Sequence, residues 1–466
     1  MRLFDWRWLV VSSLMGAALA ANAETRPQYG GVLRVAMRAA PTSLDPGDGT
    51  QPDSFARRSL AMLMFDTLVT IDPNGRIEPE LAASWQGAPG NQHWQLQIRR
   101  GVKFHDGMPL TADIAAASLR AANPSWKVSA YADSVVIERD SSDPELLAEL
   151  ALPRNAIVKR NPDNTPSGTG PFHIVDWQPG KKLALAAEEN CWRGRPFLDA
   201  IEIEMGTSFR DQMTALELGK ADLVEVAPEQ TLQFSQDQFS RDRVSRQGRR
   251  LASSTPIELL ALLFTRDVAS PEEKLLREAL AWSVERGSIR SVLLQGAGQP
   301  TAGILPNWMS GYGFVFPTDA DLPRARHARE QVRSIPTWTV GYDGSDSMAR
   351  LLTERIALNA KDAGLLLQPT PAATADLRLV RIPLASPDPW IALANVATLT
   401  GTPAGKEGGS VEDLYAREVT MLATQRMIAL FHLPVSYAAS ATLKDWTLRP
   451  DGSWTLADAW LAKGKP

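Results

Sequence analysis

Residues 94–113 of the chain read WQLQIRRGVKFHDGMPLTAD, and no other stretch is more informative about the fold. Within it Asp106-Gly107 is a turn signal, since aspartate and glycine both favour tight turns. Thr111 precedes Ala112-Asp113-Ile114 and is a candidate helix N-cap, because its hydroxyl can bond backbone N–H groups that the first turn leaves unpaired. The adjoining His105-Asp106 pair has the side chains of a catalytic dyad, but the turn signal favours a structural corner.

Strand-like and helical patterns alternate through the rest of the chain. A strand is predicted over residues 30–37, where β-branched and apolar residues follow Gly30-Gly31. The clearest helix start is Ser270-Pro271-Glu272-Glu273, which combines capping-box spacing with a proline at the first helical position. Helices are expected at residues 54–68, from 111 onward, and at 208–219, 270–287, 348–363 and 411–427. This mixture predicts an α/β protein.

Size and composition exclude several classes of protein. The 466 residues are 44% hydrophobic, so the chain can bury a large core and should form more than one domain. A net charge of -4 and the absence of a long basic stretch disfavour a nucleic-acid binder. The single cysteine, Cys191, cannot form an internal disulfide or a cysteine-based zinc cage.

The N-terminal segment has the order of a Sec signal peptide: Arg2 and Arg7 precede an apolar run over residues 8–19, and Ala21-Asn22-Ala23 follows. Cleavage is expected after Ala23, with Ala20 as the alternative. The apolar run is shorter than the roughly 20 residues that span a bilayer, although an uncleaved anchor is the other interpretation. A lipid anchor would need a cysteine just after the signal, so we expect a periplasmic protein that is not a lipoprotein.

Signatures of catalysis are missing from the sequence. The chain has no Gly-x-Ser-x-Gly elbow, His-Glu-x-x-His helix, Gly-x-Gly-x-x-Gly fingerprint or Ser-x-x-Lys motif. The stretch 401–406 is one residue too short for a phosphate loop, and the five histidines include no i, i+4 pair. We therefore expect no enzyme activity, no cofactor and no metal site.

Several blocks resemble, in order, the family 5 extracellular solute-binding proteins of ABC importers, the dipeptide- and oligopeptide-binding group. The block at 94–113 is the most specific of them. The others are Gly30 to Val35 with Leu44-Asp45-Pro46, Phe65 to Val69 with Pro79 to Trp85, Ser167 to Phe172, Asn190 to Asp199, and Ala215 to Asp222. The C-terminal half matches more loosely, through Arg277 to Val284 and Asp388-Pro389-Trp390.

The resemblance implies an α/β, two-lobed periplasmic binding protein fold (type II, cluster C) with an extra subdomain in the first lobe. The lobes of such a fold close on a ligand about a hinge. On this basis residues 1–23 are the signal peptide, 24–256 the first lobe with its subdomain, 257–430 the second lobe, and 431–466 the return to the first lobe. The chain is expected to cross between lobes at residues 257–264 and 428–437.

One departure from the family concerns the ligand. Peptide-binding members hold the ligand's ammonium with an aspartate three residues before an Asp-Pro-like step, and this chain carries Ala385 at that place. An ammonium buried without a partner is strongly unfavourable. Either Asp388 substitutes, or the ligand has no free amino terminus. A short peptide, a sugar, an opine and a metal chelate all stay open.

The resemblance places the ligand site between the lobes. Thr50 and Gln51 belong to a loop whose family counterpart meets the ligand backbone, so their polar groups are candidates for orienting a solute. Across the cleft, Tyr342 and Trp390 are candidates for aromatic contacts and Asp388 for holding a cation. The alternative is structural: Asp388 caps a turn ahead of Pro389, and Trp390 packs in the core.

These observations predict a monomeric solute-binding protein that passes a small molecule or short peptide to an ABC permease with its ATPase in the inner membrane. The alternative is a ligand-sensing or scaffold partner of a membrane receptor that uses the same closure. Permease and ATPase genes beside this gene would favour import.

Overall fold

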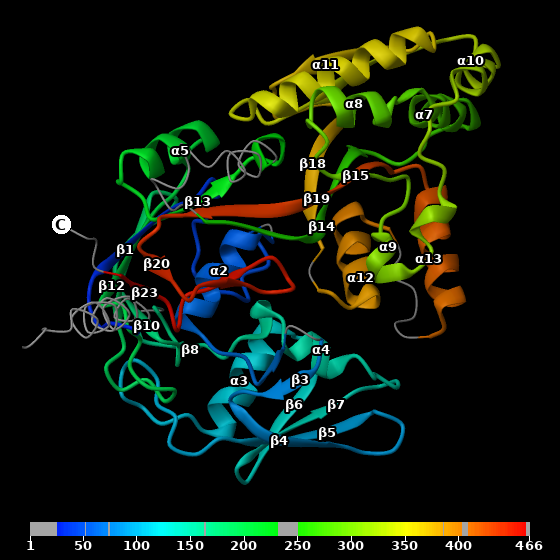
Figure 1. Cartoon of the computed structure of the whole chain (residues 1–466). Coiled ribbons are helices and arrows are strands. Elements are labelled where there is room, and N and C mark those ends of the chain that lie inside the picture. The colour runs from blue at the N-terminus through cyan, green and yellow to red at the C-terminus, as the bar shows by residue number, and fades with distance from the viewer. Residues whose placement is uncertain are drawn as a thin grey trace, which may run out of the picture.

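The computed structural model describes residues 26–51, 53–72, 75–162, 165–231, 250–384, 386–402 and 409–462. The expected signal peptide over residues 1–23 and Ala385 lie outside these ranges, as does most of the loop 401–406. The described part of the chain forms two lobes with a subdomain attached to the first lobe (Figure 1). Within it, no helix has the length and apolar character needed to span a bilayer.

The first lobe is built on one half of an 11-stranded mixed sheet, in which β1 pairs in parallel with β12 and β13. Helix α2 packs its apolar side against this half-sheet, and α5 contacts β13. The elements are β1 (Val32–Ala36), α2 (Phe55–Met64), β10 (Phe172–Gln178), β11 (Lys182–Ala187), β12 (Ala200–Glu204), α5 (Phe209–Glu217), β13 (Leu223–Val226) and the short helix η2 (Pro228–Gln230).

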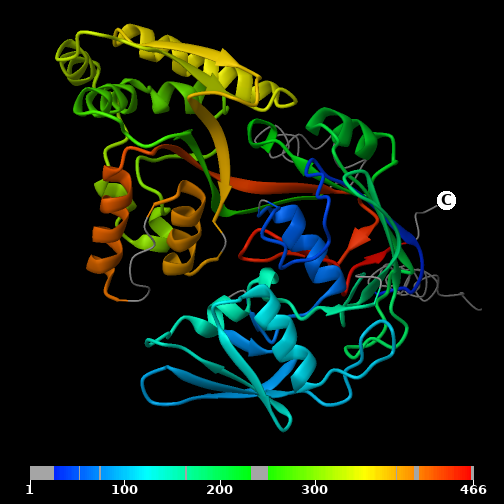
Figure 2. The ribbon, with the colours of Figure 1, turned by 180° about the vertical axis from the view of Figure 1, so that it is seen from behind.

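The subdomain has its own antiparallel sheet, in the order β4-β5-β7-β6, and its own apolar core. Helix α3 covers this sheet (Figure 2). Its elements are β2 (Val69–Ile71), β3 (Ile77–Pro79), β4 (Ala82–Gly87), β5 (His93–Ile98), α3 (Ala112–Ala122), β6 (Lys127–Tyr131), β7 (Ser134–Glu138), α4 (Leu146–Leu150), η1 (Pro153–Asn155), β8 (Lys159–Arg160) and β9 (Pro166–Ser167).

The second lobe holds the other half of the large sheet, where β16 pairs in parallel with β17 and β18. Its helices form two groups, α7, α8, α10 and α11 on one side and α9, α12 and α13 on the other (Figure 1). The elements are α7 (Pro271–Ser283), α8 (Arg286–Val292), β15 (Gln299–Pro300), α9 (Asn307–Ser310), η3 (Gly313–Val315), α10 (Leu322–Glu330), β16 (Thr337–Gly341), α11 (Ser347–Asp362), β17 (Leu366–Thr370), β18 (Leu377–Pro383), α12 (Pro389–Thr400) and α13 (Val411–Ala423).

Two long antiparallel strands, β14 (Arg250–Phe264) and β19 (Met427–Ala439), run from one lobe to the other (Figures 1 and 2). Along β19, Leu433 still packs in the core of the second lobe, whereas Tyr437 packs in the core of the first. After β19 the chain stays with the first lobe, in β20 (Leu443–Lys444), β21 (Thr447–Leu448), β22 (Trp454–Thr455) and β23 (Trp460–Leu461). The domain boundaries expected from the sequence stay predictions.

Local capping explains why most helices begin where the sequence predicts. The side chains of Thr111, Ser208 and Ser270 accept hydrogen bonds from first-turn N–H groups of α3, α5 and α7. Three predicted ends are wrong. Helix α2 ends at Met64 rather than Leu68, because Phe65 is in extended backbone. Helix α7 ends at Ser283 rather than Gly287, because Val284 turns into extended backbone and is fully buried. Met427 begins β19 instead of ending α13.

Candidate functional site

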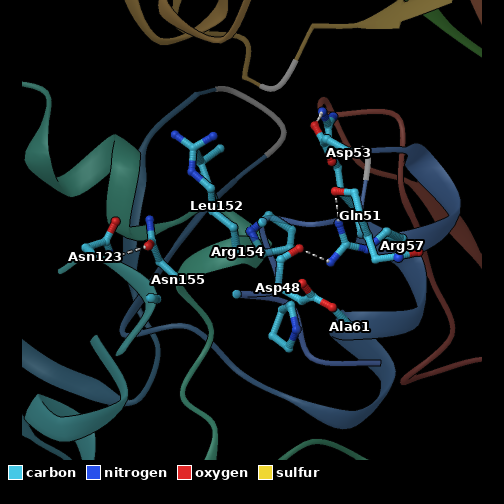
Figure 3. A pocket seen from close by; sticks show the side chains of 15 residues that line it. Asp48, Gln51, Asp53, Arg57, Ala61, Asn123, Leu152, Arg154 and Asn155 are labelled. Atoms are coloured by element: carbon cyan, nitrogen blue, oxygen red, sulfur yellow. Dashed lines mark hydrogen bonds and ion pairs between the residues drawn. The ribbon is translucent and has the colours of Figure 1, made fainter. Parts of the chain in front are cut away.

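A cavity of about 220 Å³ lies beside the N-terminal turn of α2, between the loop 46–53 and the subdomain segments 122–123 and 152–155. We call it the arginine cavity, because Arg57, Arg58 and Arg154 line it. In Figure 3, Asp48, Gln51 and Arg57 lie on one side of it and Asn123 and Asn155 on the other. Three arginines and three side-chain amides face two carboxylates, so hydrogen-bond donors dominate the wall.

Arg57 holds the loop that forms one side of the arginine cavity. Its Nη1 donates to the Gln51 carbonyl at 2.8 Å, and its Nη2 donates to the carbonyls of Asp45 and Asp48 at 3.1 Å each. Burial lowers the pKa of this guanidinium, and the nearby carboxylates oppose that effect. Because three backbone carbonyls converge on one planar group, the loop has a defined shape.

Arg58 joins three parts of the chain beneath the cavity. It is buried, it pairs with Asp53, and its Nη1 donates to the carbonyls of Leu384 at 3.3 Å and Asp451 at 3.0 Å. Leu384 belongs to the second lobe, and Asp451 lies in the C-terminal return. Burial would lower the pKa of Arg58, but the Asp53 carboxylate outweighs burial and raises it.

Arg154 reaches across to the second lobe from the other side of the cavity. Its Nη2 lies 2.7 and 2.6 Å from the two carboxylate oxygens of Glu149, which fixes the guanidinium plane. Its Nη1 donates to Oδ1 of Asn395 in α12 at 2.6 Å. The subdomain and the second lobe are therefore in contact at this arginine.

A second cavity, of about 490 Å³, lies against the crossing strands and is lined by both lobes and by residues 434–436 of β19. We call it the hinge cavity. Arg38 follows β1, Pro228 follows β13, and Asp343 comes shortly after β16, so the cavity lies at carboxyl ends of strands in both lobes. This is where open α/β sheets usually bind ligands.

The hinge cavity has the opposite electrostatic character to the arginine cavity. Two arginines line it, Arg38 and Arg381, together with the five carboxylates of Asp211, Glu225, Glu258, Asp343 and Asp346. Burial raises the pKa of Glu225, although the Arg38 backbone N–H and the Gln212 amide both donate to its carboxylate. The two cavities thus present different chemistries on the two sides of the N-terminal turn of α2.

Of the five predicted site residues, only Gln51 lines either of these two cavities. Gln51 lines the arginine cavity, and the neighbouring Thr50 donates its hydroxyl to Asp48 Oδ1 at 2.6 Å. Tyr342 packs against the core of the second lobe, one residue before Asp343 of the hinge cavity. Thr50, Gln51 and Tyr342 therefore do not line one common cavity.

Asp388 and Trp390 have structural partners. Asp388 Oδ1 caps α12, accepting from the N–H groups of Trp390 at 2.9 Å and Ile391 at 3.1 Å. Trp390 is 8% exposed and belongs to an apolar cluster beneath α12 and α13. These contacts give each residue a role without a ligand, and ligand contact by either stays a prediction.

At the expected structural corner, the His105 ring forms hydrogen bonds with backbone groups. His105 Nε2 lies 3.0 Å from the Gly170 carbonyl, and its Nδ1 accepts from the Gly168 N–H at 3.4 Å. Gly107 has a positive φ of 83°, as the turn signal requires. Among the described residues, no group of three or more His, Cys, Asp or Glu side chains could hold a metal ion.

Comparison with known families decides the identity. A family model described as bacterial extracellular solute-binding proteins, family 5 Middle, matches residues 76–365. The chain belongs to this family of ABC importer binding proteins. The match covers most of the subdomain, β14 and much of the second lobe, so the resemblance seen in the first half of the sequence is confirmed and extends into the second.

Two curated relatives bind different cargo. The nickel-binding protein NikA of Staphylococcus aureus is 26% identical over 249 residues, which are 50% of this chain and 49% of the relative. The oligopeptide-binding protein AppA of Bacillus subtilis is 23% identical over 339 residues, 66% of this chain and 59% of the relative. The matches therefore span about half to three fifths of these relatives' own length.

Solved structures share the two-lobed fold over nearly the whole chain. NikA from S. aureus in complex with Ni(L-His)2 has a TM-score of 0.77 at 18% identity, covering 92% of this chain and 99% of that one. The binding protein AgaA from A. tumefaciens, in complex with agropinic acid, has a TM-score of 0.76 at 17% identity, covering 93% and 99%. The predicted fold class is thus confirmed.

Proposed function

We propose that this family member is the exported solute-binding component of an ABC importer. It binds a small solute or short peptide between its lobes and delivers it to a membrane permease with its ATPase. The observation that carries the proposal is the position of the arginine cavity between the first lobe and its subdomain, where the lining residues Arg58 and Arg154 also bond to Leu384 and Asn395 of the second lobe. In this proposal the solute extends from the cavity to the second-lobe segment that carries Leu384 and Asn395, and so favours the closed arrangement of the lobes.

The side chains that line the arginine cavity favour one class of solute. Its arginines and amides donate hydrogen bonds, so the favoured solute carries several acceptors such as carboxylate, carbonyl or hydroxyl oxygens. The relatives named above bind nickel, oligopeptides and agropinic acid, so the family leaves the cargo open. The donor-rich wall also agrees with the absence of the aspartate that holds a peptide ammonium in this family.

Gln51 and Thr50 orient the solute in this proposal, and the segment with Asp388 and Trp390 closes over it from the second lobe. The proposal keeps Tyr342 as a candidate aromatic contact from the second lobe, where it packs against the core next to Asp343. The N-terminal pattern of residues 1–23 supports export through the Sec system into the periplasm, where the protein works as a monomer.

The first test identifies the solute that stays bound through purification by native mass spectrometry, then titrates it back into the stripped protein. We expect the solute to raise the melting temperature and to reduce the radius of gyration in small-angle scattering. Arg154→Ala should weaken binding about tenfold or more, because it removes charge-assisted hydrogen bonds next to the solute.

The matched control is Arg100→Ala in the same subdomain. Arg100 pairs only with Asp133 at an exposed position, so its removal should leave affinity unchanged. A solute that binds without compaction, or equal affinities for both variants, would contradict the proposed site.

A further inference from the structure

The covalent connection between the lobes offers little resistance to bending. At the point where β14 and β19 pass between lobes, Pro256 pairs with Pro434, and the register of the ladder shifts on both sides of Pro256. Proline has no backbone N–H and cannot donate to the ladder. Non-covalent contacts between the lobes must therefore set how far they open.

The only ion pairs between the lobes, among the residues that the structure describes, involve Arg38. This residue of the first lobe follows β1, and its Nη1 and Nη2 lie 3.4 Å from carboxylate oxygens of Asp346 and Asp343 in the second lobe. The contacts from Arg58 and Arg154 to the second lobe end instead on neutral acceptors, the Leu384 carbonyl and the Asn395 amide. Among the described residues, the ion pairs between the lobes therefore lie at the hinge cavity and not at the arginine cavity.

Arg38 is positioned for this contact from the side of the first lobe. Its backbone N–H donates to the buried Glu225 carboxylate, and its guanidinium lies 4.6 Å from the centre of the Phe209 ring. Three quarters of the side chain is shielded from solvent. The guanidinium is thus held at the edge of the first lobe before the lobes meet.

The part of the second lobe that faces Arg38 carries more carboxylates than arginines. The side chain of Asp346 is 5% exposed. Its Oδ1 caps α11, and its Oδ2 lies 3.4 Å from the guanidinium of Arg381. Arg381 also pairs with Glu258 at 3.1 Å, so two carboxylates share this arginine, and Asp343 adds a third negative charge to the same side of the hinge cavity. Arg38 supplies the second cation when the lobes come together.

We infer that Arg38, Asp343 and Asp346 form an electrostatic latch that stabilises the closed arrangement of the lobes without touching the solute. The inference rests on the proposed function and adds the regulation of the same closure. Because Asp343 and part of Arg38 are exposed, salt screens the latch. Ionic strength therefore changes the closed population, and through it the apparent affinity for solute.

The test measures the distance between the lobes in the full chain without solute. Spin labels are placed by Tyr131→Cys in the subdomain and Leu358→Cys in α11, two exposed positions, in a Cys191→Ser background. We expect Arg38→Gln to lower the closed population about two- to fivefold at low salt, the range of a partly exposed ion pair. In about 1 M salt, where the Debye length is about 3 Å, the parent protein should match the variant.

A second variant and a control keep the result specific to the latch. Asp346→Asn removes the charge but keeps a good helix cap, so it should reproduce Arg38→Gln, and combining the two should add little further loss. Arg34→Gln is the control, because Arg34 lies on β1 and pairs with Asp222 inside the first lobe at 3.0 Å. It should leave the distances unchanged.

The inference is contradicted if Arg38→Gln and Arg34→Gln give the same distribution of distances between the spin labels. It is also contradicted if salt leaves that distribution unchanged in the parent protein. The measurement contains no solute, so this outcome differs from failure of the proposed function, which would appear as a solute that binds without compaction.

Discussion

Replacing Gly168 by alanine is expected to lower the free energy of unfolding by about 3 kcal/mol or more, near the upper end for overpacked cores. A Cβ atom at this position would lie 1.9 Å from the Met64 carbonyl oxygen and 2.5 Å from Phe65 Cδ1. Met64 is the last residue of α2, and its carbonyl accepts the Gly170 N–H, so neither backbone can withdraw without breaking a contact. Urea unfolding measures the loss.

The same substitution should also weaken solute binding, since α2 carries Arg57 and Arg58 into the arginine cavity. Gly287→Ala is the matched control: its Cβ meets no atom within 4 Å, and it lies inside α8, where alanine is the better helix former. That variant should be unchanged or slightly more stable. An equal unfolding midpoint for Gly168→Ala and the parent protein would disprove the close approach of residues 167–170 to α2.

Replacing Trp390 by alanine is expected to cost about 3–5 kcal/mol of stability, the usual range for a buried aromatic side chain. Trp390 packs in the cluster under α12 and α13, with Arg417 5.9 Å from the centre of its ring. Thermal and urea unfolding of the unliganded protein measure the effect. Phe314→Ala serves as the control, because Phe314 is 78% exposed on the same lobe.

The Trp390 result also tests its predicted role in binding. If Trp390 is mainly a core residue, stability falls while the affinity of Trp390→Phe for solute stays near that of the parent protein. The opposite pattern, with unchanged stability and weaker binding, would place the indole in the ligand site.

The sequence predicts the fold well where the signals are local. Capping residues such as Ser208 and Ser270 act on N–H groups two or three positions away, so a short pattern contains the whole interaction. The glycines at 168 and 170 belong to a recognised block, yet the block does not reveal that they lie against the end of α2. That contact joins segments about a hundred residues apart.

The candidate site was predicted less completely for the same reason. Arg38 meets Asp343 and Arg154 meets Asn395 only after folding, across separations of 305 and 241 residues. Nothing in the sequence distinguishes these arginines from the other members of a set of 49 lysines and arginines. Gln51 was predicted because it belongs to a loop that the family resemblance marks as ligand-facing; it lines the arginine cavity, and its contact with a solute stays a prediction.

The most direct test of the account is a crystal structure of the protein with the solute that it retains during purification. The account predicts density between the lobes, with contacts to Gln51 and Arg154 on one side and to the segment 384–395 on the other, and with Arg38 paired to Asp343 and Asp346. Density confined to one lobe, or a solute enclosed while Arg38 lies apart from both aspartates, would contradict it.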